Sequence, residues 1–169
     1  MSLNPRARLT PEEYLAIERA AEERSEYVNG EMFALSGASF AHTVITANLV
    51  ASLHVRLRAK PCTVHAADLK VRVEATGLHA YPDVVVVCGE PRFADAGRDV
   101  VTNPVLLVEV LSESTEKWDR GAKFGHYRLQ RFSETAGGFL PEMYQEDVTE
   151  LGGSGKPAGL AWSRRSEGA

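Results

Sequence analysis

A chain of 169 residues, of which 44% are hydrophobic, is long enough for one globular domain and too apolar for a disordered protein. Its net charge of −4 argues against a domain that holds nucleic acid by overall electrostatic attraction, because such domains are usually basic. The charge is uneven, however. Residues 12–31 are strongly acidic and residues 54–74 and 115–131 are basic, which leaves room for a local basic surface beside an acidic pocket.

Residues 10–23 carry the signals of an N-terminal helix. Thr10 suits the N-cap, Pro11 suits the first helical position, and Glu13 is placed to complete a capping box. Apolar side chains then recur at helical spacing up to about Glu23. We expect this helix to pack against the domain and to carry no chemistry.

A β-hairpin is predicted next. Asn29-Gly30 separates the strand-like residues 25–28 and 31–35, and this dipeptide suits the positive φ angles of a type I′ turn. Glu31 opens the second strand of the hairpin. Taken alone, it is a solvated hairpin residue.

The segment Ser36-Gly37-Ala38-Ser39 ends this strand and can cap a long helix, which we expect from about Phe40 to Ala59. His42 lies in the first turn of that helix, where the positive end of the helix dipole disfavours a protonated imidazole. Two interpretations stay open for His42. A neutral ring could hydrogen-bond a carboxylate, a water or a phosphate, or the residue could be purely structural.

Strands are also predicted at residues 62–66 and 69–73. In the second strand apolar residues alternate with Lys70 and Arg72, a half-exposed pattern. The chain then turns at residues 76–79 towards a more apolar strand.

The chain has two cysteines, Cys62 and Cys88, and both lie in apolar or strand-like surroundings. We interpret them as small buried hydrophobes, since neither a zinc spacing nor a disulfide framework is visible, and this fits a reducing compartment. Residues 1–8 are polar and offer no core for a signal peptide, and no run has the length of a transmembrane helix. We therefore expect a cytoplasmic protein without membrane contact.

Two further strands each carry one carboxylate. Residues 81–88 and 104–111 are continuous apolar runs, as expected for strands covered on both faces. Asp83 stands at the entrance of the first strand, and Glu109 interrupts the second. A buried ionised carboxylate is costly unless a partner charge or a metal offsets it, so the two strands indicate a cation between these side chains. The simpler alternative is that Asp83 follows a Pro turn and Glu109 pairs with a nearby Arg or Lys.

A helix is predicted from Glu116 to about Arg131, after the second carboxylate strand. Its polar side chains are Lys117, Asp119, Arg120, Lys123 and Tyr127. Lys123 could reach back over the strand ends, which strengthens the functional interpretation of the two carboxylates. The polar loop of residues 89–103 is long for a simple connection, and such loops often shape substrate access.

Several of these segments together resemble the Uma2 (DUF820) family. The matching segments are Tyr27-Val28-Asn29-Gly30-Glu31, Ser36-Gly37-Ala38, His42, Tyr81-Pro82-Asp83, Glu109-Val110-Leu111-Ser112 and the helix with Asp119, Lys123 and Tyr127. The resemblance covers roughly residues 9–130. It implies the restriction-endonuclease-like core of the PD-(D/E)XK nuclease superfamily, an α/β fold with a mixed central β-sheet flanked by helices. It also implies a metal-dependent DNA endonuclease.

The resemblance implies roles for five side chains. Asp83 and Glu109 would hold Mg²⁺ or Mn²⁺, hard cations that favour oxygen ligands. Lys123 would orient the attacking water or stabilise a transition-state oxygen. Glu31 would be an outer carboxylate near the metal, and His42 an accessory polar group.

One position departs from the wider superfamily. Leu111 stands two residues after Glu109, where the ExK pattern has a lysine. The resemblance implies that the lysine has moved to the following helix, where Lys123 is the matching position. Asp119 and Tyr127 match family positions too, although Asp119 could equally brace the helix and Tyr127 could pack against the sheet.

The C-terminal end departs from the family pattern after about Gln130. Residues 132–169 hold seven of the 14 glycines and show no sustained period of a strand or a helix, as in a linker or tail. We therefore divide the chain into a nuclease-like domain at residues 1–131 and an atypical tail at residues 132–169. A shifted reading frame or altered terminus would explain such a tail and would leave the final core strands missing. A core without its edge strands would be marginally stable, or would need a partner chain, such as a second copy in a homodimer, to cover it.

The function expected from these features is metal-dependent hydrolysis of DNA phosphodiester bonds. The alternative is a catalytically silent module that retains the nuclease fold and binds nucleic acid or protein. A second alternative is a purely structural role for Asp83 and Glu109 in an unrelated α/β fold. The intact carboxylates favour the enzyme, and the departure at the C-terminal end favours the silent module.

Overall fold

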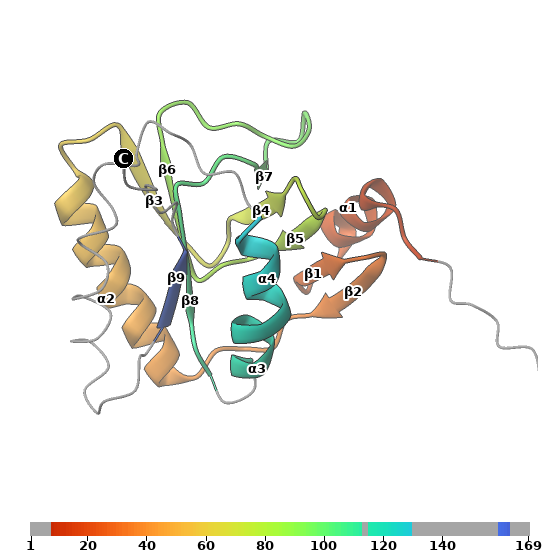
Figure 1. The fold of residues 1–169 in the computed structure, drawn as a ribbon, viewed down its shortest axis with the longest axis horizontal. Helices are drawn as coiled ribbons and strands as arrows, with labels where there is room; N and C mark the ends of the chain where they lie inside the picture. The colour runs from red at the N-terminus through yellow and green to blue at the C-terminus, as the bar shows by residue number, and fades with distance from the viewer. Residues whose placement is uncertain (1–7, 113–114, 130–158, 163–169) are drawn as a thin grey trace, which may run out of the picture.

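The structure is a computed structural model that describes residues 8–112, 115–129 and 159–162. Figure 1 shows an α/β arrangement of strands and covering helices. The elements in chain order are α1 (Pro11–Ala20), β1 (Ser25–Val28), β2 (Glu31–Ala34), α2 (Phe40–Leu57), β3 (Cys62–Ala66), β4 (Lys70–Val73), β5 (Leu78–Ala80), β6 (Val84–Cys88), β7 (Val100–Val101), β8 (Leu106–Val110), α3 (Glu116–Trp118), a π-helical turn (Asp119–Lys123), α4 (Phe124–Tyr127) and β9 (Gly159–Trp162). The predicted fold class is confirmed.

The strands form two hydrogen-bonded sheets rather than the single central sheet expected. One is mixed, with the strand order β2-β1-β5-β4-β7, in which β4 and β7 run parallel. The other has the order β3-β6-β8-β9, and all of its neighbouring strands are antiparallel. The polar loop predicted at residues 89–103 contributes β7 to the mixed sheet.

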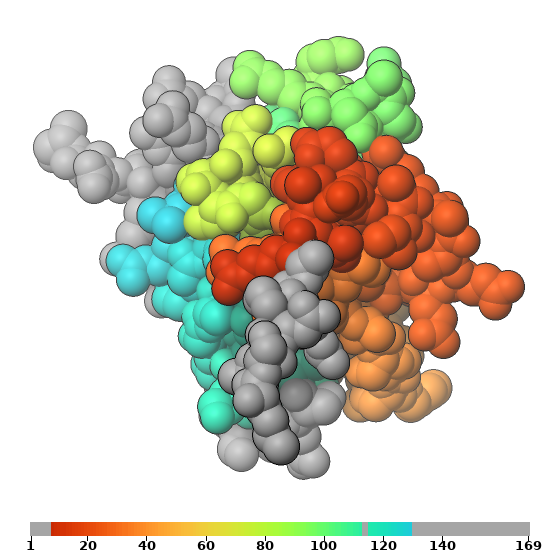
Figure 2. Space-filling model, turned by 90° about the vertical axis from the view of Figure 1, so that its right-hand side faces the viewer, coloured from red at the N-terminus to blue at the C-terminus, as the bar shows by residue number. Residues whose placement is uncertain are grey.

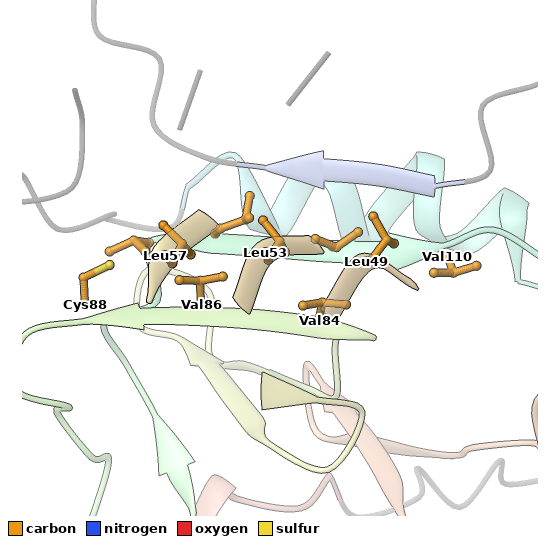
Figure 3. Close-up of a cluster of buried hydrophobic side chains, with 10 residues drawn as sticks. Leu49, Leu53, Leu57, Val84, Val86, Cys88 and Val110 are labelled. Atoms are coloured by element: carbon orange, nitrogen blue, oxygen red, sulfur yellow. The ribbon is translucent and has the colours of Figure 1, made fainter. Parts of the chain in front are cut away.

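Strand β6 is apolar throughout because both of its faces are covered. Val84 and Val86 pack under α2, where Leu49, Leu53 and Leu57 point towards the sheet, as Figure 3 shows. The alternate residues of β6 pack in a second cluster that includes residues of β4 and β5 and the Tyr127 ring. The two faces of β8 are covered by the same two clusters. This two-sided burial confirms the interpretation of the continuous apolar runs.

The N-terminal elements form as their local signals predict. The Thr10 hydroxyl accepts the Glu13 N–H, the Glu13 carboxylate accepts the Thr10 N–H, and Pro11 begins α1. Asn29 and Gly30 have φ angles of 50° and 88°, as the predicted hairpin turn requires. On the face shown in Figure 2 the N-terminal segments, in red and orange, cover the centre and the right side, with the green loop above them and the cyan helical segment to their left.

Cys62 and Cys88 do pack with the buried apolar cluster under α2, but the expectation that they form no disulfide is wrong. Cys62 and Cys88 form a disulfide, because the antiparallel register of β3 and β6 places them directly opposite each other. The sequence did not show this relation, since it depends on which strand pairs with β3. The cytoplasmic prediction therefore loses the support of the cysteines. Within the described residues no helix is long and apolar enough to cross a membrane.

The half-exposed pattern predicted for β4 is also wrong at Lys70. Its side chain is 2% exposed and forms an ion pair with Glu18 of α1. The Tyr81 hydroxyl donates to the same carboxylate at 2.5 Å, and the Lys70 ammonium lies 5.0 Å from the centre of the Tyr14 ring. A helix that was expected only to pack therefore supplies the partner of a buried lysine.

Most of the predicted tail, residues 132–169, lies outside the described residues. The exception is β9, which pairs with β8 from Leu107 opposite Trp162 to Val110 opposite Gly159. The expectation that this end holds no strand is therefore wrong at residues 159–162. The division of the chain at residue 131 stays a prediction.

Candidate active site

The register of β6 and β8 brings the two predicted metal ligands together. Val84 of β6 is opposite Val108 of β8 at one end of this antiparallel pair. Asp83 directly precedes Val84 and Glu109 directly follows Val108, so the two carboxylates lie close enough for the charge of Asp83 to affect the pKa of Glu109. The Val110 N–H donates to Asp83 Oδ2 at 2.7 Å, which fixes the orientation of this carboxylate.

Glu109 lies in a buried network centred on Lys123. The Lys123 ammonium is 2.9 Å from Glu109 Oε1, 2.7 Å from Glu26 Oε1 and 3.8 Å from Asp119 Oδ1. The Tyr127 hydroxyl donates to Glu109 Oε1 at 2.7 Å. The predicted reach of Lys123 to the strand ends is therefore present, and Tyr127 contacts the carboxylate as well as packing in the core.

A π-helical turn positions the helical side chains of this network. The Phe124 N–H donates to the Asp119 carbonyl five residues earlier, so the turn is wider than in an α-helix. An α-helix has 3.6 residues per turn, so side chains four apart drift around its axis, and a wider turn reduces this drift. Asp119, Lys123 and Tyr127, each four apart, are all buried on the side that faces Glu109. The sequence predicted a regular helix here and missed this turn.

His42 lies on the more accessible side of the cluster. Ser39 caps α2, and His42 in the first turn places Nε2 at 3.2 Å from Asp83 Oδ2. The side chains of His42 and Asp83 are 16% and 17% exposed, against 5% for Glu109 and Lys123. A ligand would therefore meet Asp83 and His42 first.

The cluster contains more carboxylates than positively charged side chains. Asp83, Glu109, Asp119 and Glu26 surround the single ammonium of Lys123. Burial raises the pKa of Glu109 to about 8; the charge of Lys123 opposes this shift, and the negative charges of Asp83 and Glu26 add to it. Burial likewise raises the pKa of Asp83 and of Asp119. Burial lowers the pKa of Lys123, but the carboxylates of Glu109 and Glu26 outweigh it and leave that pKa above its ordinary value, so the lysine is charged.

Comparisons with known proteins show the family of this chain. The profile of the Uma2 family, described as "Putative restriction endonuclease", matches residues 11–136. This chain belongs to the Uma2 family. Two similar proteins of Synechocystis sp. (strain ATCC 27184 / PCC 6803 / Kazusa) are named "Uncharacterized protein sll1609" and "Uncharacterized protein slr1290". They are 38% and 40% identical to it over 120 and 123 residues, which cover 71% and 73% of this chain and 68% and 64% of those proteins.

A solved structure shows the same fold. The chain is similar to the crystal structure of "a putative nuclease belonging to DUF820" from Anabaena variabilis ATCC 29413, with a TM-score of 0.57 and 17% identity. The match covers 70% of this chain and 66% of that one. The fold of this Uma2 protein is therefore of the restriction-endonuclease-like type.

The donor set of this Uma2 protein fits a hard divalent cation in part. Asp83 and Glu109 offer oxygen ligands near each other, and a bound cation would favour the ionised form of both carboxyl groups, whose pKa values burial raises. Among the residues that the structure describes, no group of three or more His, Cys, Asp and Glu side chains is arranged to hold a metal ion. Mg²⁺ does not require one, because it is commonly bound by one or two carboxylates, with water and substrate phosphate as its other ligands.

The structure does not bring Glu31 into this cluster. Glu31 is exposed beside the hairpin turn, opposite Val28, whereas Glu26 in β1 contacts Lys123. Glu26 was not predicted from the sequence, although a strand period of two places it on the same face as the apolar Val28. Trp118 was not predicted either, and its indole N–H donates to Glu26 Oε2 at 3.3 Å.

Proposed function

We propose that this Uma2 protein is a metal-dependent endonuclease that hydrolyses phosphodiester bonds of DNA. The observation that carries the proposal is the neighbouring pair of carboxylates, Asp83 and Glu109, beside the buried ammonium of Lys123. These residue types are the ones that hydrolysis of a phosphodiester needs, since negative charge builds up on the phosphate oxygens during attack by water.

Asp83 and Glu109 would hold Mg²⁺ or Mn²⁺. When bound, the cation would lower the pKa of a water and neutralise charge on the phosphate. Asp83 is preorganised for this role by the Val110 N–H, and Glu109 by the Tyr127 hydroxyl and Lys123. Preorganised groups need no rearrangement during the reaction, which is where such sites gain most of their effect.

Lys123 and Glu26 complete the proposed site. The carboxylate of Glu26 holds the ammonium at 2.7 Å, and the ammonium in turn lies 2.9 Å from Glu109. Lys123 would orient the attacking water or stabilise a developing oxygen charge, and Glu26 would take the outer position first assigned to Glu31. His42, 3.2 Å from Asp83, would contact a phosphate oxygen on the accessible side.

One observation favours the alternative of a catalytically silent module. The ammonium of Lys123 already compensates Glu26 and Glu109 in part, so the buried network can be stable without a metal ion. Metal binding and DNA cleavage separate the two functions.

The test is calorimetric titration of the purified full chain with Mn²⁺ and Mg²⁺, together with incubation with plasmid and single-stranded DNA. Asp83→Asn and Glu109→Gln should each abolish metal binding and cleavage while the circular dichroism spectrum is kept. The matched control is Glu31→Gln, which changes an exposed carboxylate on the same hairpin as Glu26 into a carboxamide. This variant should behave as wild type. Metal binding that survives in both Asp83→Asn and Glu109→Gln would refute the site, and a folded wild type without metal binding would favour the silent module.

A further inference from the structure

An aromatic pair lies beside the proposed active site. Phe33 of β2 is 46% exposed, and its ring centre is 6.1 Å from that of Trp118 at the end of α3, with the two planes tilted by 32°. We call these two side chains the aromatic pair. Their contact joins the hairpin to the helical segment that carries Lys123. The half-exposed ring of Phe33 leaves an apolar face that a flat ligand can cover.

The aromatic pair is connected to the carboxylate cluster by two direct contacts. The Trp118 indole N–H donates to Glu26 Oε2 at 3.3 Å, and the other oxygen of Glu26 is 2.7 Å from the Lys123 ammonium. Glu26 and Phe33 are also opposite each other in the register of β1 and β2. A phosphate held at the cluster would therefore place its neighbouring nucleotide near the exposed ring of Phe33.

The chemistry of this surface fits an unpaired nucleobase. Bases have apolar faces that stack on aromatic side chains, and each such contact contributes about 1–3 kcal/mol. In a duplex these faces are covered by neighbouring base pairs, so an aromatic side chain selects nucleotides that are single-stranded or displaced from the stack. Lys117 is an exposed basic side chain on the same helical segment and suits a ligand that combines bases with phosphates, whereas the exposed Arg120 is paired with Glu116 at 2.7 Å.

We propose that the aromatic pair is a stacking surface for the unpaired base next to the scissile phosphate, and that the substrate is single-stranded or locally opened DNA. This inference rests on the proposed function and specifies its substrate class. Phe33 contacts the base, and Trp118 supports Phe33 while it holds Glu26.

The experiment uses short single strands that carry 2-aminopurine, a fluorescent base that is quenched by stacking, and the same sequence as a duplex. Binding of the wild type is measured with Ca²⁺ in place of Mg²⁺, and binding of the variant Glu109→Gln is measured as well. Cleavage is measured with Mg²⁺. The full-length wild type should quench the single strand and cleave it faster than the duplex. Phe33→Leu should lose the quenching and bind the single strand about tenfold more weakly, because a stacked base is lost. Phe33→Tyr should retain both.

The matched control is Phe124→Leu, the same change at an exposed phenylalanine of α4 that lies outside the aromatic pair. It should quench and cleave as wild type does. Equal quenching by wild type and Phe33→Leu would overturn the inference, as would preferred cleavage of the duplex. Cleavage that depends on Glu109 but not on Phe33 would leave the proposed function intact and remove the stacking surface. A protein that neither binds nor cleaves either DNA would end both proposals.

Discussion

Replacing Glu109 by Gln is expected to remove most of the pH dependence of stability between about pH 5 and 8. Burial, with Asp83 and Glu26 nearby, raises the pKa of Glu109 from an ordinary value of 4.5 to about 8. The folded protein thus keeps a proton on Glu109 that the unfolded chain releases above pH 4.5. Raising the pH through this window favours the unfolded chain.

The magnitude follows from the two pKa values. The interval from 4.5 to about 8 corresponds to a loss of about 5 kcal/mol in the free energy of unfolding, as an upper limit because neighbouring carboxylates titrate with Glu109. Glu109→Gln does not titrate and mimics the protonated acid. It should therefore match wild type near pH 5 and be more stable by up to about 5 kcal/mol near pH 8.

The assay is urea unfolding of both proteins in the presence of EDTA at several pH values, followed by circular dichroism. A residual fall is expected in Glu109→Gln, since burial also raises the pKa values of Asp83 and Asp119. Parallel stability curves for wild type and Glu109→Gln would refute the reasoning, because they would show that Glu109 titrates alike in the folded and unfolded states.

Three further predictions concern stability. Lys70→Met should lower the free energy of unfolding by about 3–5 kcal/mol, because it leaves the carboxylate of Glu18 buried without its cation. The double variant with Glu18→Leu should recover part of this loss. A Lys70→Met protein as stable as wild type in urea would contradict the prediction. Reduction of the Cys62–Cys88 disulfide should cost about 3 kcal/mol, from the loop entropy of a separation of 26 residues, and an unchanged melting temperature in dithiothreitol would argue against it. Gly30→Ala should cost about 2 kcal/mol because it places a side chain at a φ of +88°, and a loss well below 1 kcal/mol in urea unfolding would be inconsistent with that turn.

The sequence predicted those parts of the fold that depend on local chemistry. The capping box at Thr10, the Asn29-Gly30 turn and the Ser39 cap each act within a few residues, and the elements they begin or join were placed close to their observed bounds. The continuous apolar runs also indicated correctly that β6 and β8 are covered on both faces, because that property is present in each strand by itself.

The features that were missed depend on which segments meet. Cys62 becomes a disulfide partner only because β3 pairs with β6, and no periodicity encodes that pairing. Lys70 resembles an exposed strand residue until α1 brings Glu18 over it. Glu26 could have been found from the sequence in part, because the strand period of two places it on the same face as the buried Val28. Glu31 was chosen instead, through the family motif alone.

Strand β9 has a consequence for the order of folding. Its partner β8 ends at Val110, whereas β9 begins at Gly159, so a long stretch of chain must be closed before the two strands pair. Closing a long loop costs entropy and contacts of this kind form late. We therefore expect α2, β3, β6 and β8 to assemble first, with one edge of β8 open for a time. An open edge can pair with another chain, so the yield of refolded monomer should fall as the protein concentration rises.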